Sequence, residues 1–172
     1  MKKSSQLFES NIFKKTVLVL GAIFYIFTIL IVFNPDPFLK FGYLGVFLFN
    51  LFGPGTVLVP MLSRHMNVFW ISILGSAGMA LNDSVGWLVG RSGDVVIPRS
   101  KRIEKLEKKL QKWGSYALFG WALIPFPYDI VAMVAGYLEI PYRKFVLPVF
   151  LGRVIRFIVL GTGVVAIWGK VV

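Results

Sequence analysis

Cysteine is absent from this sequence of 172 residues, and histidine occurs once, at His65. The absence of cysteine excludes disulfides and thiol chemistry, and a single histidine argues against a histidine-based metal site. A membrane enzyme acting on lipid phosphate would need a nucleophile with a positioned base, or clustered carboxylates that hold a metal. The sequence contains only eight acidic residues and shows no such cluster. It therefore predicts no enzymatic activity, no metal and no cofactor.

Charge is scarce in this chain, and apolar residues are abundant. Charged residues make up 16% of the sequence, whereas a soluble domain carries about a quarter. Hydrophobic residues make up 56%, and several apolar runs approach the roughly 20 residues with which an α-helix crosses a bilayer. The sequence therefore predicts an all-α integral membrane protein, with apolar segments at 16–33, 41–63, 66–90, 113–142 and 144–168.

The first apolar run, residues 16–33, contains no charged residue and leads into the sequence NPDPFLK. A signal peptide would have a shorter apolar region and would end at a small-residue cleavage site. We therefore interpret this run as a retained N-terminal transmembrane helix. The lysines in residues 1–15 indicate a cytoplasmic N-terminus. We expect a multi-pass protein of the plasma (cytoplasmic) membrane.

Glycine and proline interrupt two of the later segments. Residues 41–63 contain a Gly-Pro-Gly sequence and residues 113–142 contain closely spaced prolines, both of which break the helical hydrogen-bond ladder. Each interrupted segment is either a proline-kinked span or a re-entrant hairpin that enters and leaves on one side of the membrane. In the second case the hairpin tips contain Gly53, Pro54, Gly55, Pro125 and Pro127.

The distribution of basic residues favours the hairpins. If residues 41–63 formed a simple span, the basic linker 91–112 would lie outside, against the positive-inside rule. With two hairpins the linker is cytoplasmic, and so are most of the 19 basic residues. Each hairpin is then followed by a transmembrane helix, and the two units enter from opposite sides. Residues 41–90 and 113–168 are thus predicted to form an inverted repeat within a membrane domain at 34–172. In transporters such a repeat marks a binding site near the midplane.

The linker has a helical pattern of its own. Ile103, Leu106, Leu110 and Trp113 share one helical face, and lysines cover the other. We interpret the linker as an amphipathic helix on the cytoplasmic leaflet, serving as a topological spacer. The net charge of +11 then reflects cytoplasmic loops, with anionic-lipid binding as an added option. No nucleic-acid partner is expected.

Ionisable residues at bilayer depth cost roughly 2.5–3.5 kcal/mol each on insertion scales. The candidates are Asp83, Asp129, Glu139, Arg153 and Arg156, with Arg64 near the edge. Glu139 is close to the cytoplasmic turn and is interpreted as an interface residue, which leaves the two aspartates, Arg153 and Arg156. A carboxylate in a low-dielectric environment can exchange protons near neutral pH, and a guanidinium group binds phosphate through two hydrogen bonds. We therefore expect the aspartates to couple protons or substrate, and the arginines to bind a lipid headgroup. The alternative is that the four residues form a buried network that only holds the hairpins together.

Several motifs in this sequence resemble those of the DedA family, also called the VTT or SNARE-associated superfamily. The hairpin LFGPGTVLVP and the stretch GSAGMALNDSVGWLVGRSGD come first, and LIPFPYDIVAMVAGYLEIPYRKF and GRVIRF follow in the family's order. The resemblance covers residues 40–165. A GDxxxYxxGR-like pattern falls on Asp83, Trp87, Gly90 and Arg91. Asp129 beside Pro127 is similar to the short, YqaA-like branch.

The resemblance implies two opposed re-entrant hairpins and a role in moving lipid between leaflets, often with proton dependence. The lipid would be a phospholipid or a polyprenyl-phosphate carrier. Many bacterial relatives carry a glutamate where this chain has Thr56, and arginines where it has Ala122 and Tyr128. Two alternatives stay open: a proton-coupled exporter of small solutes or cations, and a non-transport membrane assembly protein. The partners expected are membrane lipids and protons, and a homo-oligomer is one of the assembly states that stay open.

Overall fold

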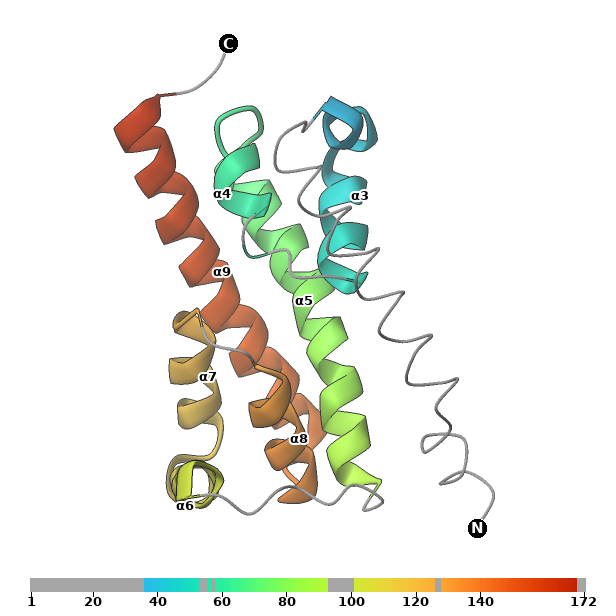
Figure 1. Ribbon diagram of the computed structural model, residues 1–172, viewed down its shortest axis with the longest axis vertical. Coiled ribbons are helices and arrows are strands. Elements are labelled where there is room, and N and C mark those ends of the chain that lie inside the picture. The colour runs from blue at the N-terminus through green and yellow to red at the C-terminus, as the bar shows by residue number, and fades with distance from the viewer. Residues whose placement is uncertain (1–35, 53–55, 57, 93–100, 126–127, 170–172) are drawn as a thin grey trace.

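A computed structural model describes residues 36–52, 56, 58–92, 101–125 and 128–169 (Figure 1). These residues form seven α-helices and no strand, in agreement with the predicted all-α class. The predicted N-terminal transmembrane helix at 16–33 lies outside the described residues. So do four of the five predicted hairpin-tip residues: Gly53, Pro54, Gly55 and Pro127.

Two long helices form the centre of the molecule. α5 (Val68–Arg91) has 24 residues and α9 (Tyr142–Trp168) has 27, so at 1.5 Å per residue they are about 36 and 40 Å long. Both exceed the roughly 30 Å of a hydrocarbon core, and both are apolar enough to cross a membrane. They contact each other and run in opposite directions (Figure 1). Their ends lie within two residues of those expected for the segments 66–90 and 144–168.

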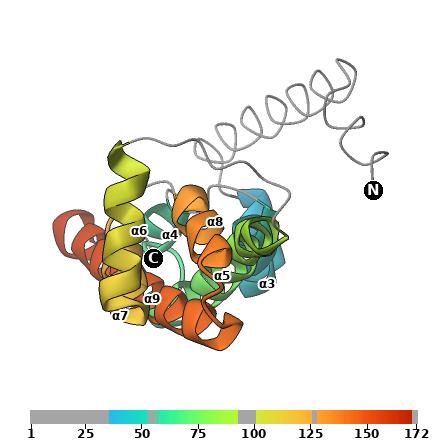
Figure 2. The same ribbon diagram turned by 90° about the horizontal axis from the view of Figure 1, so that it is seen from below.

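Four shorter helices lie beside opposite ends of this central pair. α3 (Asp36–Phe52) and α4 (Leu58–Leu62) lie at one end, and α7 (Ser115–Leu123) and α8 (Asp129–Tyr137) lie at the other (Figure 1). The seventh helix, α6 (Lys101–Trp113), crosses the end of the molecule below α7 and beside α8 (Figure 2). The C-terminal ends of α3 and α7 and the first residues of α4 and α8 therefore lie toward the middle of the molecule (Figure 1).

Each short helix packs on one of the long helices in a matched pattern. α3 contacts α5 and α7 contacts α9, whereas α4 packs mainly on α9 and α8 packs on α5. Glycine allows the close approaches. A Cβ atom at Gly78 of α5 would collide with the carbonyl oxygen of Phe47 in α3, and one at Gly152 of α9 would lie 2.8 Å from the carbonyl oxygen of Phe119 in α7. Both glycines come ten residues after the first residue of their helix. Each long helix therefore packs against a short helix at the corresponding position along its length.

The amphipathic helix α6 packs its apolar face onto the protein. Leu106 and Leu110 are buried, in one cluster with residues of α7 and α8 such as Leu118 and Val131. Trp113, which was expected on the same face, is 57% exposed. The leucine face that was predicted to rest on the leaflet is therefore occupied by the second pair of short helices, because these provide the nearest apolar surface. The lysines of α6 with described side chains remain exposed.

Candidate functional site between the long helices

An ion pair joins α5 and α9, and no other is present among the described residues. A carboxylate oxygen of Asp83 in α5 contacts Nη2 of Arg153 in α9, and the two residues are only 5% and 3% exposed. Both lie at least eight residues from either end of their helix, which is about 12 Å along the axis. Since an unpaired charge at this depth is costly, each residue neutralises the other where the two long helices meet.

Arg156 lies one turn after Arg153 on α9 and links the ends of two short helices. Its Nη1 donates a hydrogen bond of 3.0 Å to the carbonyl oxygen of Ile124, which follows α7. Its Nη2 donates to the hydroxyl of Thr56, which precedes α4, at 3.3 Å, and lies 3.9 Å from the sulfur of Met79. Arg156 therefore connects the two segments that were predicted to be hairpin tips.

A proline explains why the Ile124 carbonyl is free to accept this bond. The residue before a proline is restricted to extended backbone conformations, and Ile124, which precedes Pro125, has φ −93° and ψ 139°. α7 therefore ends at this point, and no following turn of helix takes the carbonyl. Pro125 itself, the one predicted tip residue that the structure describes, is exposed.

Tyr128 closes one side of the ion pair. The Arg153 guanidinium lies 5.2 Å from the centroid of the Tyr128 ring, a distance typical of a cation–π interaction. The Tyr128 hydroxyl donates to the carbonyl oxygen of Leu118 at 2.9 Å, which holds the ring between α7 and the start of α8. With 4% of its surface exposed, Tyr128 is part of the wall around Arg153.

Several buried polar atoms in this region have no hydrogen-bond partner among the described residues. On α9 they are Nε and Nη1 of Arg153 and Nε of Arg156. On α5 they include the hydroxyls of Ser72 and Ser76, which lie eleven and seven residues before Asp83 and so share its helical face. Buried N–H donors without a described partner are thus present on Arg153 and Arg156 of α9. Such donors suit a polar ligand such as a phosphate group.

Asp129 lies apart from the ion pair. It occupies the first position of α8 and is exposed, and it pairs with no described cation. Its backbone carbonyl lies beside Gly86 of α5, three residues after Asp83. The structure therefore buries three of the four predicted site residues together. Asp129 is at the exposed edge of that group, outside the buried network that the sequence predicted.

Sequence reasoning missed two members of this site, Tyr128 and the carbonyl of Ile124. An aromatic residue in an apolar stretch is indistinguishable from an ordinary core residue, and a backbone carbonyl carries no residue-type signal. The useful signal was Pro125, because a proline that ends a helix leaves unpaired carbonyls before it. Among the described residues there is no group of three or more metal-ligating side chains.

Residues 53–165 match the VTT domain, a range that covers more than half of the chain and includes all four predicted site residues. An uncharacterized protein of Methanocaldococcus jannaschii is 24% identical over 127 residues, which cover 67% of this chain and 79% of that protein. No solved structure matches the chain.

Proposed function

Because this chain belongs to the VTT-domain family of membrane proteins, also called the DedA family, we propose that it moves lipids between the two leaflets of a bilayer, as a flippase or scramblase. The observation that supports this proposal is the burial of Arg153 and Arg156 between the long helices. A guanidinium group binds phosphate through two parallel hydrogen bonds. Phosphate is the charge that a phospholipid or a polyprenyl-phosphate carrier must bring across the apolar core.

In this proposal the chain forms an inverted repeat. Residues 36–91 (the first half) and residues 115–168 (the second half) each contain a re-entrant hairpin, α3–α4 or α7–α8, followed by a membrane-spanning helix. The position of the two short-helix pairs at opposite ends supports this arrangement (Figure 1). So do the lengths of α4, α7 and α8, which have 5, 9 and 9 residues. None of the three exceeds about 14 Å, so each reaches at most about halfway through a hydrocarbon core of roughly 30 Å.

The proposed orientation follows the basic residues. The lysine-rich α6 lies on the cytoplasmic side of the plasma membrane, together with the N-terminus. The lysines at 105, 108, 109 and 112 are exposed, and α6 is at the opposite end of the molecule from the C-terminal end of α9 (Figure 1). The protein is then multi-pass, with the ion pair of Asp83 and Arg153 near the middle of the bilayer.

In the proposed mechanism, Asp83 and a lipid phosphate compete for Arg153. A phosphate that reaches the ion pair replaces the carboxylate as the partner of the guanidinium. The released carboxylate takes up a proton, because an unpaired charge at this depth is costly. Asp129, at the exposed edge, exchanges that proton with solvent. Headgroup passage and proton movement are thereby coupled.

Arg156 has a second role in this mechanism. Its hydrogen bonds to the Ile124 carbonyl and the Thr56 hydroxyl hold the two hairpin tips together. A phosphate bound to Arg156 would replace these weak acceptors, because charge-assisted hydrogen bonds are roughly twice as strong as neutral ones. Binding of the headgroup then separates the tips and opens the path between the leaflets.

The test is lipid movement in reconstituted liposomes, followed by leaflet-specific quenching of fluorescent lipids with and without a pH gradient. We expect Arg153→Gln and Arg156→Gln each to slow movement by about tenfold or more, because each removes a charged phosphate donor. The matched control is Arg143→Gln, an exposed arginine in the first turn of the same helix, which should keep the wild-type rate. Wild-type rates in both buried variants would remove the arginines from the mechanism.

A second variant tests the proton step. Asp129→Asn should insert and fold normally yet abolish transport, because the exposed proton exchanger is lost. Glu139→Gln, which neutralises another exposed carboxylate in the turn after α8, is the control and should behave like wild type. If the wild-type protein moves no lipid under either condition, the proposal fails. Export of small solutes then becomes the better proposal for the same helices.

A further inference from the structure

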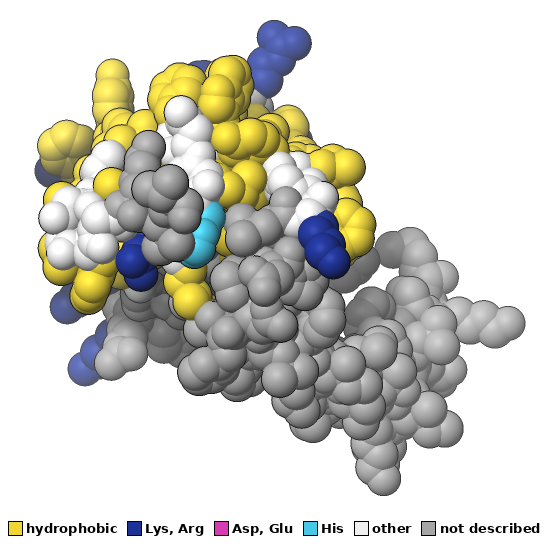
Figure 3. Space-filling view, turned by 90° about the horizontal axis from the view of Figure 1, so that it is seen from above, with side chains coloured by type: hydrophobic (Ala, Val, Ile, Leu, Met, Phe, Trp, Pro, Cys, Tyr) yellow, Lys and Arg dark blue, Asp and Glu magenta, His cyan; other side chains and the backbone are white. Residues whose placement is uncertain are grey.

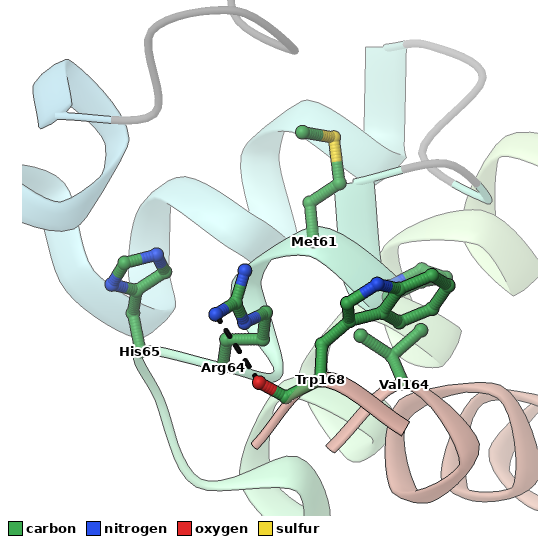
Figure 4. Close-up of a pocket in the computed structure, with 6 residues that line it drawn as sticks. Met61, Arg64, His65, Val164 and Trp168 are labelled. Atoms are coloured by element: carbon green, nitrogen blue, oxygen red, sulfur yellow. Dashed lines mark hydrogen bonds between the residues drawn. The ribbon is translucent and has the colours of Figure 1, made fainter. Parts of the chain in front are cut away.

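A second candidate site lies at the end of the molecule opposite α6, between α4 and the C-terminal end of α9. Its pocket has a volume of about 300 Å³ and is lined by Pro60, Met61, Arg64, His65, Val164 and Trp168 (Figure 4). The lining is mostly apolar, with Arg64 and His65 as its polar side chains. An apolar wall beside a cation suits an amphipathic ligand better than a soluble ion.

Arg64 is held in position and still has hydrogen-bond donors available. Its Nε donates to the carbonyl oxygen of Gly169 at 3.2 Å. Its Nη2 donates to that of Trp168 at 3.4 Å (Figure 4). These carbonyls end α9 and have no N–H partner within the helix. A guanidinium group has five N–H donors, so three remain free of described partners. Two of them, one on Nη1 and one on Nη2, form the Nη1–Nη2 edge, which can bind a phosphate through two hydrogen bonds.

No described carboxylate competes for that edge. Seen from this end, the molecule shows basic side chains and the single histidine among hydrophobic ones, and no acidic side chain among the described residues (Figure 3). The acidic residues whose side chains are described lie in α5, in α6, in α8 and in the turn after α8: Asp83, Glu104, Glu107, Asp129 and Glu139. The described side chains around the pocket are therefore complementary in charge to an anion.

The pocket also lies at the level where both spans end. Arg64 comes four residues before the first residue of α5, and Trp168 is the last residue of α9. Tryptophan is typical of the membrane–water interface, and long basic side chains near span ends extend toward it. The phosphate groups of one leaflet lie at this depth.

We propose that this pocket binds an anionic phospholipid of the leaflet opposite α6. The lipid phosphate is held by the Nη1–Nη2 edge of Arg64, with His65 beside it, and an acyl chain lies along Met61 and Val164. The site is separate from Arg153 and Arg156, and binding there requires no movement of lipid between leaflets. A test that contradicts lipid transport would therefore leave this binding proposal intact, and a test that contradicts binding would leave the transport proposal intact.

Native mass spectrometry of the detergent-purified protein counts the phosphatidylglycerol molecules that it retains. We expect Arg64→Gln to bind the tightest of these lipids about tenfold more weakly, since a charge-assisted bidentate contact is lost. Arg143→Gln, the same change in an exposed arginine at the opposite end of α9, should bind as the wild type does. Arg153→Gln should also leave this binding unchanged, which separates the pocket from the transport site.

A second variant keeps Arg64 and its bonds to the end of α9. Val164→Phe fills the pocket and should reduce phosphatidylglycerol binding, whereas Val159→Phe, at an exposed position of the same helix, should not. Equal binding by wild type, Arg64→Gln and Val164→Phe would overturn the proposal. Equal retention of phosphatidylcholine by the wild type would overturn the preference for an anionic lipid. Displacement by glycerol phosphate alone would identify a soluble phosphate as the ligand instead.

Discussion

The two halves of the chain share an arrangement of helices but supply different chemistry to the centre. Each half has two short helices and one long helix, and each long helix also receives a short helix from the other half. The first half contributes the carboxylate of Asp83 and the hydroxyl of Thr56. The second half contributes Arg153, Arg156 and the ring of Tyr128. Since neither half contains both members of the ion pair, the site exists only where the halves meet.

The two long helices also differ in how deeply they are buried. α5 buries ten of its residues, and the longer α9 buries seven. α5 is covered by α3, α8 and α9, whereas the second part of α9 leaves Val159, Leu160 and Ile167 exposed. Apolar side chains of this kind are stable against lipid. α5 is therefore the more buried of the two long helices, although its Leu81, Val85 and Leu88 are exposed as well.

The largest expected loss of stability comes from removing the carboxylate that the first half supplies to the ion pair. Asp83→Leu leaves Arg153 as an unpaired charge between the long helices, which should lower the free energy of unfolding by about 3–5 kcal/mol. Unfolding in detergent, followed by circular dichroism, measures this loss. The double variant Asp83→Leu/Arg153→Met removes both charges and should recover most of the stability. A double variant as unstable as the single one would contradict this explanation.

A smaller loss of stability is expected from disturbing the close packing between each long helix and the short helix of its own half. Gly78→Ala and Gly152→Ala introduce a methyl group against the backbone of α3 or α7 and should each cost about 1–3 kcal/mol. Gly163→Ala, in α9 with no atom within 4 Å of the new methyl group, should instead stabilise the helix by about 0.5–1 kcal/mol. The same unfolding experiment compares the three. If Gly78→Ala and Gly152→Ala behaved like Gly163→Ala, the matched close packing would be disproved.

The smallest effects are expected at the two predicted hairpin tips. Tyr128→Phe removes a buried hydrogen bond to Leu118 and should cost about 0.5–1.5 kcal/mol. Thr56→Val should cost less, because its bond from Arg156 is longer, at 3.3 Å, and Arg156 keeps the Ile124 carbonyl. Thermal unfolding of the two variants side by side measures the difference. A larger loss in Thr56→Val would show that the first tip is the more important anchor for Arg156.

The long helices were predictable from the sequence because apolar length acts locally. Segments 66–90 and 144–168 are long and apolar enough to span a bilayer whatever their neighbours, and α5 and α9 occupy nearly the same residues. The helical pattern of the linker was equally clear, yet its surroundings were not. Periodicity identifies the apolar face of α6 but cannot say whether lipid or protein covers it, and here Leu106 and Leu110 pack on α7 and α8.

The sequence by itself determined that this is a helical membrane protein and which residues carry charge at bilayer depth, since both depend on residue type and local order. Only the tertiary structure decided which of these charges meet. Asp83 pairs with Arg153 because α5 and α9 turn these two side chains toward each other. Asp129 stays exposed at the first position of α8. The acceptor for Arg156 was likewise decided by the fold, since the Ile124 carbonyl becomes available only where α7 ends beside α9.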